Sequence, residues 1–148
     1  MTSTPAARPT AIHHVRLTVT DIHRSKSFYQ LLFGPETAFD FSDRVDEPGV
    51  RDDPSQLYGG AGFQIGDQLL GLRPVAASSD SFDSTRVGLD HLSLLVGSQQ
   101  ELDDAAQRMD EAGIEHGQVT RLEETGMVIL SIQDPDDINI ELVYLPSS

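Results

Sequence analysis

A short strand-like segment that carries a histidine occurs twice in this chain. Residues 88–96 read GLDHLSLLV, and residues 11–19 read AIHHVRLTV. Short apolar runs of this kind are typical of strands in a sheet. In each copy a polar break and a helical pattern follow, and His14 and His91 hold equivalent places 77 residues apart. The sequence therefore predicts one structural module that is written twice.

Each module is expected to have the element order β-α-β-β-β. Asp21 suits the N-cap of a helix over residues 21–33, and Ser98 with Glu101 has capping-box spacing before a helix over residues 99–112. Glycine ends both helical patterns. Strands are expected over residues 12–19, 37–41, 57–65 and 68–73 in the first module, and over 88–96, 117–122, 127–132 and 138–145 in the second. Residues 42–55 are acidic and are expected to form a loop.

The same patterns predict the domain organisation. The modules span residues 11–74 and 87–146, and a Ser-, Ala- and Asp-rich linker over residues 75–86 joins them. Residues 1–10 are expected to form a flexible tail. Because 148 residues suit one compact core, residues 11–146 are expected to form a single domain.

The composition excludes several classes of partner and site. The chain has ten basic and 24 acidic residues, which gives a net charge of −14, so nucleic acid and anionic membranes are not expected partners. No apolar run approaches the ~20 residues of a membrane helix. The absence of cysteine excludes disulfides, thiolate metal sites and cysteine nucleophiles. The first ten residues lack a secretory pattern, which favours a cytoplasmic location.

A carboxylate in the last expected strand completes a candidate metal site. Glu141 lies between Ile140 and Leu142, and a charge in an apolar strand needs a cation, a donor or water. His14, His91 and Glu141 supply two imidazoles and one carboxylate, which suit divalent iron, manganese, zinc, nickel or cobalt. Structural histidines and an edge-strand charge are the alternatives, but the repeat favours ligation because it places both histidines equivalently.

Other polar residues are weaker candidates. Arg16 and Arg73 could line the cavity that His14 faces and bind an anionic group of a substrate, but pairing with the many surface acids is the favoured explanation. Tyr58 precedes two glycines and could reach a ligand or simply pack against a strand. His13 is expected to point away from His14, although a shift of one residue would exchange them. His116 is expected to be a surface or cap residue, with an acid/base role as the alternative.

Ordered motifs along the chain carry a resemblance to a known superfamily. They are IHHV at 12–15, TD at 20–21 leading through SFY at 27–29 to Gly34, LDHL at 89–92, and DPD at 134–136 followed by IEL at 140–142. Together they resemble the vicinal oxygen chelate superfamily, which contains glyoxalase I, extradiol dioxygenases, fosfomycin-resistance enzymes and bleomycin-binding proteins. The resemblance implies an α+β fold of two repeated β-α-β-β-β modules that form a curved mixed sheet around a cavity, with the helices outside.

The resemblance also implies where metal ligands come from, namely the first and last strands of each module. The corresponding positions hold His14, Gly71, His91 and Glu141, so the first-module carboxylate typical of glyoxalase I is missing. A set of two histidines and one carboxylate resembles the dioxygenase and fosfomycin-enzyme pattern. It leaves metal positions open for substrate oxygens or water.

Two functions are therefore predicted as alternatives. The first is a metal-dependent enzyme of glyoxalase or dioxygenase type that acts on a small oxygenated molecule by dioxygenation, isomerisation, lyase chemistry or epoxide opening. The second is a metal-free protein that sequesters a small molecule such as an antibiotic and so confers resistance. The intact set of His14, His91 and Glu141 favours the enzyme, because a binder has no need of it. A homodimer is expected from the resemblance alone.

Overall fold

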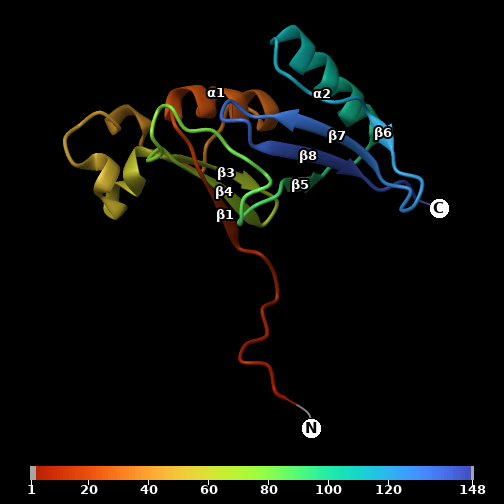
Figure 1. Cartoon of the computed structure of the whole chain (residues 1–148), viewed down its shortest axis with the longest axis horizontal. Coiled ribbons are helices and arrows are strands. Elements are labelled where there is room, and N and C mark those ends of the chain that lie inside the picture. The colour runs from red at the N-terminus through yellow and green to blue at the C-terminus, as the bar shows by residue number, and fades with distance from the viewer. Residues whose placement is uncertain (1–2, 148) are drawn as a thin grey trace. The chain divides into compact units, whose positions relative to one another are not determined.

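Two four-stranded mixed sheets with the same strand order contain all the strands within residues 3–147, the part of the chain that this computed structural model describes (Figure 1). The chain divides into two compact units, Met1–Ala76 and Ala77–Ser148. One sheet has the order β1-β4-β3-β2 and the other has the order β5-β8-β7-β6. The predicted α+β fold of two β-α-β-β-β modules is therefore confirmed. That residues 11–146 act as a single domain stays a prediction.

The first unit places one helix on one face of its sheet. Its elements are β1 (His14–Thr18), α1 (Ile22–Phe33), β2 (Phe39–Asp40), β3 (Ala61–Ile65) and β4 (Gln68–Arg73). β1 pairs with β4 in parallel, whereas the other pairs are antiparallel. Tyr29 of α1 is fully buried, and its ring centroid lies 6.2 Å from that of Phe63 in β3. In β1, Leu17 is buried while His14, Arg16 and Thr18 are exposed, as strand alternation requires when one face packs against a core.

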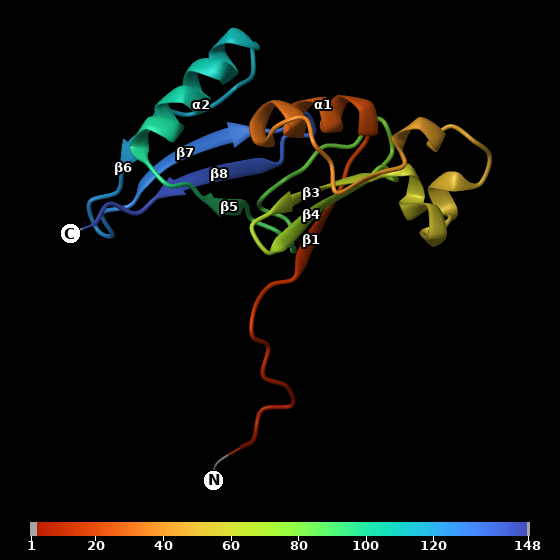
Figure 2. The ribbon, with the colours of Figure 1, turned by 180° about the vertical axis from the view of Figure 1, so that it is seen from behind.

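The second unit repeats this arrangement with its own helix (Figure 2). Its elements are β5 (Leu92–Leu95), α2 (Gln99–Glu111), β6 (Thr120–Arg121), β7 (Val128–Gln133) and β8 (Asn139–Tyr144). Leu102 and Met109 of α2 are buried, as are the apolar positions of β7 and β8 that alternate along each strand. This alternation leaves Asn139 and Glu141 on the opposite face of β8.

Local hydrogen bonds show why the elements begin and turn where they do. Asp21 Oδ1 accepts from the backbone N–H groups of His23 and Arg24 at the start of α1. Ser98 Oγ accepts from Glu101 N, and the Glu101 carboxylate accepts from Gly97 N in return. The predicted caps of both helices are thus present.

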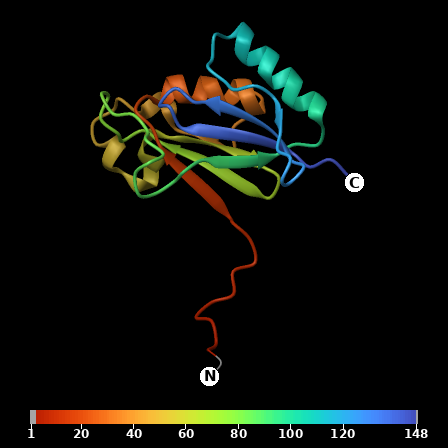
Figure 3. The same cartoon turned by 45° about the vertical axis from the view of Figure 1, so that its right-hand side comes forward.

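One segment departs from the expected pattern. Three short 3-10 helices, η1 (Ser42–Arg44), η2 (Val50–Asp52) and η3 (Pro54–Gly59), replace the loop expected over 42–55 and the start of the strand expected over 57–65 (Figure 3). Leu57 and Tyr58 have φ values of 46° and 59°, and a left-handed backbone cannot continue a strand ladder. β3 therefore begins only at Ala61.

The histidine-bearing strand of the second module is also shorter than expected. The pattern predicted residues 88–96, but β5 covers only Leu92–Leu95, so His91 lies just before it. Residues 3–13 contain neither helix nor strand. None of the helices within residues 3–147 combines the length and the apolar character needed to cross a membrane.

Candidate functional site

The second unit brings His91 and Glu141 together. β5 runs parallel to β8, and the register places Ser93 opposite Glu141. Ser93 Oγ donates to Glu141 Oε1 at 2.8 Å. The other carboxylate oxygen, Oε2, lies 3.9 Å from His91 Nε2. The hydroxyl of Ser93 thus holds one oxygen of the carboxylate while the second oxygen faces the imidazole.

Asp90 orients the His91 ring. Asp90 Oδ1 lies 2.6 Å from His91 Nδ1, and an ionised carboxylate can only accept. Nδ1 therefore carries the proton in this bond, which leaves the lone pair of a neutral ring on Nε2, on the side of Glu141. A carboxylate that accepts from the distal nitrogen is the usual partner of a metal-binding histidine.

The His91–Glu141 pair fits a divalent metal in chemistry and approximately in spacing. Two ligand atoms about 2.1 Å from one metal lie roughly 3.0–3.4 Å apart at octahedral or tetrahedral angles, so the observed 3.9 Å needs only a small closure. The side chain of Glu141 is 17% exposed and that of His91 38% exposed, so both are shielded but reachable. A neutral imidazole nitrogen and a carboxylate oxygen are suitable donors for first-row metals.

His14 belongs to the first unit, so the structure joins only two of the three predicted ligands. His14 Nδ1 lies 2.9 Å from His13 Nδ1, and the two rings meet edge to face at a centroid distance of 5.1 Å. His13 was expected to point away, but β1 begins at His14, so strand alternation does not constrain residue 13. Within residues 3–147, no three His, Asp or Glu side chains gather closely enough to hold a metal ion. The complete ligand set stays a prediction.

In the first unit, an arginine and a glycine take the places of Ser93 and Glu141. Arg16 lies opposite Gly71 in the β1–β4 pairing, two residues after His14, just as Ser93 follows His91. A Cβ added at Gly71 would lie 3.6 Å from both Cγ and Nε of Arg16. Arg16 therefore lies against the backbone of β4 at the position where the second unit has its carboxylate.

Arg73 and Tyr58 form a second contact in the first unit. The guanidinium carbon of Arg73 lies 3.8 Å from the centroid of the Tyr58 ring, a cation–π geometry. Nε of Arg73 is buried and has no hydrogen-bond partner within residues 3–147. Arg73 lies opposite Thr18 in the β1–β4 pairing. Thr18 is on the exposed face of β1, together with His14 and Arg16. The three substrate candidates, Arg16, Tyr58 and Arg73, thus lie in one unit, and their role in binding stays a prediction.

His116 has a structural environment. Its Nε2 lies 2.6 Å from Asp110 Oδ1, near the end of α2, and its Nδ1 lies 2.6 Å from the carbonyl oxygen of Gly117. The hydrogen bond to Asp110, followed by that to Gly117, raises the pKa of His116 above 6.5. With both ring nitrogens engaged, His116 ties the helix end to the next segment, which supports the cap interpretation.

Pattern reasoning missed three features of the second unit. Asp90 and Ser93 orient His91 and Glu141, and position alone could have suggested them, because they neighbour His91 or share its strand face. The third feature is a hollow of about 310 Å³ in which the linker meets the sheet. Its lining combines residues 81–84 with polar residues of β7, of β8 and of the turn between them, namely Ser81, Phe82, Asp83, Ser84, Gln133, Asp137 and Asn139.

Comparisons with known proteins agree with this architecture. Residues 11–142 match the family model described as Glyoxalase/Bleomycin resistance protein/Dioxygenase superfamily. A crystal structure of a glyoxylase/bleomycin resistance protein/dioxygenase domain from a Frankia species is 25% identical, with a TM-score of 0.71 over 96% of each chain. No match was found among curated proteins.

Two more distant structures share the fold. Lactoylglutathione lyase from Agrobacterium tumefaciens is 22% identical, with a TM-score of 0.64 over 93% of this chain and 96% of that chain. A genomically encoded fosfomycin resistance protein from Listeria monocytogenes is 16% identical, with a TM-score of 0.67 over 94% of this chain and 96% of that chain. The repeated modules and a family match that covers most of the sequence lead to one assignment: this chain belongs to the Glyoxalase/Bleomycin resistance protein/Dioxygenase superfamily.

Proposed function

We propose that this protein is a metal-dependent enzyme that acts on a small oxygenated molecule, with the metal held by His14, His91 and Glu141. The observation that carries the proposal is the oriented pair in the second unit. His91 presents Nε2 towards Glu141 Oε2 at 3.9 Å, while Asp90 and Ser93 hold the far side of each group. A pair that served only to stabilise the sheet would have no need of a carboxylate on the distal nitrogen.

The roles of the three residues follow from their chemistry. His91 and His14 would donate imidazole nitrogens, and Glu141 would donate one carboxylate oxygen and lower the net charge of the site. Gly71 offers no side chain, so positions on that side would be left for water or two neighbouring oxygens of a substrate. A divalent iron, manganese, zinc, nickel or cobalt ion bound there would supply Lewis-acid polarisation of a substrate oxygen.

Metal analysis of variants tests the proposal. Protein purified without chelator is expected to contain about one equivalent of a first-row metal. Glu141→Ala and His91→Ala are each expected to lose it, and His14→Ala to lose most of it, with unchanged far-UV circular dichroism. His23→Ala is the matched control, because His23 is an exposed residue of α1. Full metal content in Glu141→Ala would overturn the assignment.

A second readout separates a lost ligand from a damaged fold. After metal removal, titration with cobalt(II) reports the coordination geometry through its visible absorption. The native protein is expected to bind one cobalt with nitrogen and oxygen ligands. If the native protein binds none of the five metals, the metal-free sequestering function takes the place of the enzyme.

We also propose that the protein works as a homodimer in the cytoplasm, and light scattering at micromolar concentration checks the dimer. Co-expression of His14→Ala and Glu141→Ala chains with different tags then locates His14. If the site is shared between two copies, the mixed dimer recovers one native metal site. If the site lies within one chain, the mixed dimer binds no more metal than the two single variants do.

A further inference from the structure

We propose that the exposed face of the first unit's sheet binds the anionic group of the substrate, through Arg16 and Arg73. The inference rests on the proposed function, because His14 lies on the same strand face two residues before Arg16. It adds the substrate class: a small molecule that carries a carboxylate, phosphonate or phosphate group in addition to the oxygens that reach the metal.

Gly71 gives Arg16 a defined place on this face. Arg16 Nε would lie 3.6 Å from a Cβ at position 71, and the Phe39 ring would lie 3.8 Å from the same point. The side chain therefore reaches across to the Gly71 position of β4, and the Phe39 ring borders the same position. This packing reduces the conformational entropy that Arg16 would lose on binding an anion.

Arg73 is positioned by a strained segment. Its guanidinium stacks on Tyr58, which stands in left-handed backbone at φ 59° directly after Leu57 at φ 46°. Left-handed backbone at residues other than glycine is costly and persists where the surrounding structure enforces it. Gly60 allows this segment to approach β4 closely, because a Cβ at position 60 would lie 2.0 Å from the carbonyl oxygen of Leu72. The segment after β2 thus holds an aromatic platform against Arg73.

Neither arginine has an anionic partner among residues 3–76, although the protein as a whole is acidic. Within residues 3–76, neither Arg16 nor Arg73 makes an ion pair, and the buried Nε of Arg73 donates no hydrogen bond. Because this Nε is closed to solvent, an anion would be bound by the terminal amino groups of the guanidinium. Arginine is also suited to two-point binding of carboxylate and phosphonate oxygens.

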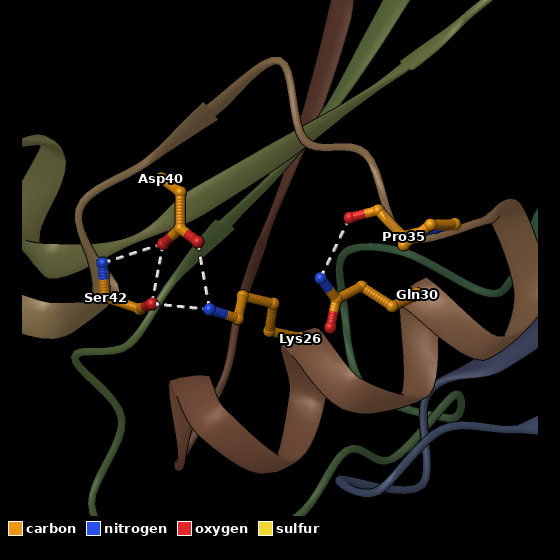
Figure 4. A network of polar contacts seen from close by, with 5 residues as sticks. All are labelled: Lys26, Gln30, Pro35, Asp40 and Ser42. Carbon is orange, nitrogen blue, oxygen red and sulfur yellow. Dashed lines mark hydrogen bonds and ion pairs between the residues drawn. The ribbon is translucent and has the colours of Figure 1, made fainter.

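Asp40 of β2, a carboxylate of the same unit, lies in the row of Leu72 and Leu17, on the other face of the sheet from the arginines. Asp40 Oδ2 accepts from Lys26 Nζ at 2.9 Å, and Asp40 Oδ1 accepts from both the backbone N–H and the hydroxyl of Ser42 (Figure 4). Burial alone raises the pKa of Asp40, but the hydrogen bonds from Ser42 and Lys26 outweigh it, and the net pKa is lowered. Asp40 therefore stays ionised and bound to α1, and it does not neutralise the arginines.

The test uses methylphosphonate, an anion without the neighbouring oxygens of a metal-chelating substrate. Calorimetric titration of metal-stripped full-length protein is expected to show binding at one site. Arg16→Gln and Arg73→Gln are each expected to weaken it by about tenfold or more, since each removes charge-assisted hydrogen bonds. Arg108→Gln is the matched control, because it removes the same charge from an exposed position of α2. An unchanged affinity in either test variant would overturn the inference.

A second variant tests the place of Gly71. Gly71→Glu puts a carboxylate against Arg16 and is expected to abolish methylphosphonate binding, with circular dichroism unchanged. Native binding in that variant would count against the site. Glu141→Ala separates the two proposals: it should lose metal and keep methylphosphonate binding. If the native protein takes up metal but binds no methylphosphonate at ~10 mM, this inference fails and the metal site stands. If it binds methylphosphonate but takes up no metal, the metal site fails and the anion site stands.

Discussion

Arg16 lies opposite Gly71 in the first unit, whereas the equivalent positions of the second unit hold Ser93 opposite Glu141. The two pairs share strand order, strand direction and register. In one pair a short hydroxyl donates to a carboxylate at 2.8 Å, and in the other a long cation lies over a bare backbone. The repeat therefore supplies two equivalent positions with opposite chemistry, one suited to a metal cation and one to an anion.

Substitution of two glycines should show how tightly this face is packed. At Gly71 a Cβ meets its neighbours at 3.6 Å or more, so Gly71→Ala should change the free energy of unfolding by no more than about 1 kcal/mol. At Gly62 a Cβ would lie 2.3 Å from the Phe39 ring, so Gly62→Ala should destabilise the protein by about 1–3 kcal/mol. Urea denaturation measures both values. Equal stability of the two variants would contradict the packing described for Phe39.

Loss of the Asp90 carboxylate should weaken metal binding without abolishing it. Asp90→Asn removes the negative charge of the group that accepts from the His91 ring, and changes at such partners typically reduce metal affinity by about 10- to 100-fold. Because the side chain of Asp90 is 79% exposed, the lower end of this range is expected. Competition with a chromophoric chelator gives the affinity, and Asp103→Asn, an exposed change in α2, is the control. A native affinity in Asp90→Asn would show that the charge of Asp90 does not contribute to metal binding.

The His116–Asp110 bond should make stability depend on pH. The pKa of His116 is raised in the folded protein, so its contribution is fully present below pH 6.5 and is lost as the pH rises through the folded pKa. Because this bond is near the surface, the loss should stay below about 1 kcal/mol. Thermal denaturation from pH 6 to pH 9 measures it.

Asp110→Asn tests the source of this effect. Without the carboxylate the pKa of His116 should fall, and the decline of stability with rising pH should flatten. Asp103→Asn should keep the native slope, since it lies on the same helix and has no contact with His116 in the described residues. The same slope in Asp110→Asn and the native protein would assign the dependence to another group.

Much of the local structure was predictable because local patterns determine it. Asp21 and Ser98 cap the helices as their positions predicted, and the Gly66–Asp67 turn joins β3 to β4. Alternation in β1 correctly placed Leu17 inside and Arg16 outside. These features depend on neighbours within a few residues, so the sequence alone carries the information.

The tertiary structure decided the contacts that give these faces their chemistry. Ser93 meets Glu141 across 48 residues of sequence, and Arg73 stacks on a Tyr58 whose left-handed backbone no strand pattern predicts. The sequence determines the residue types, whereas the parallel register of β5 with β8 and of β1 with β4 determines which side chains face each other. Register depends on the packing of a whole sheet against its helix, and a shift of one residue would move every side chain to the other face.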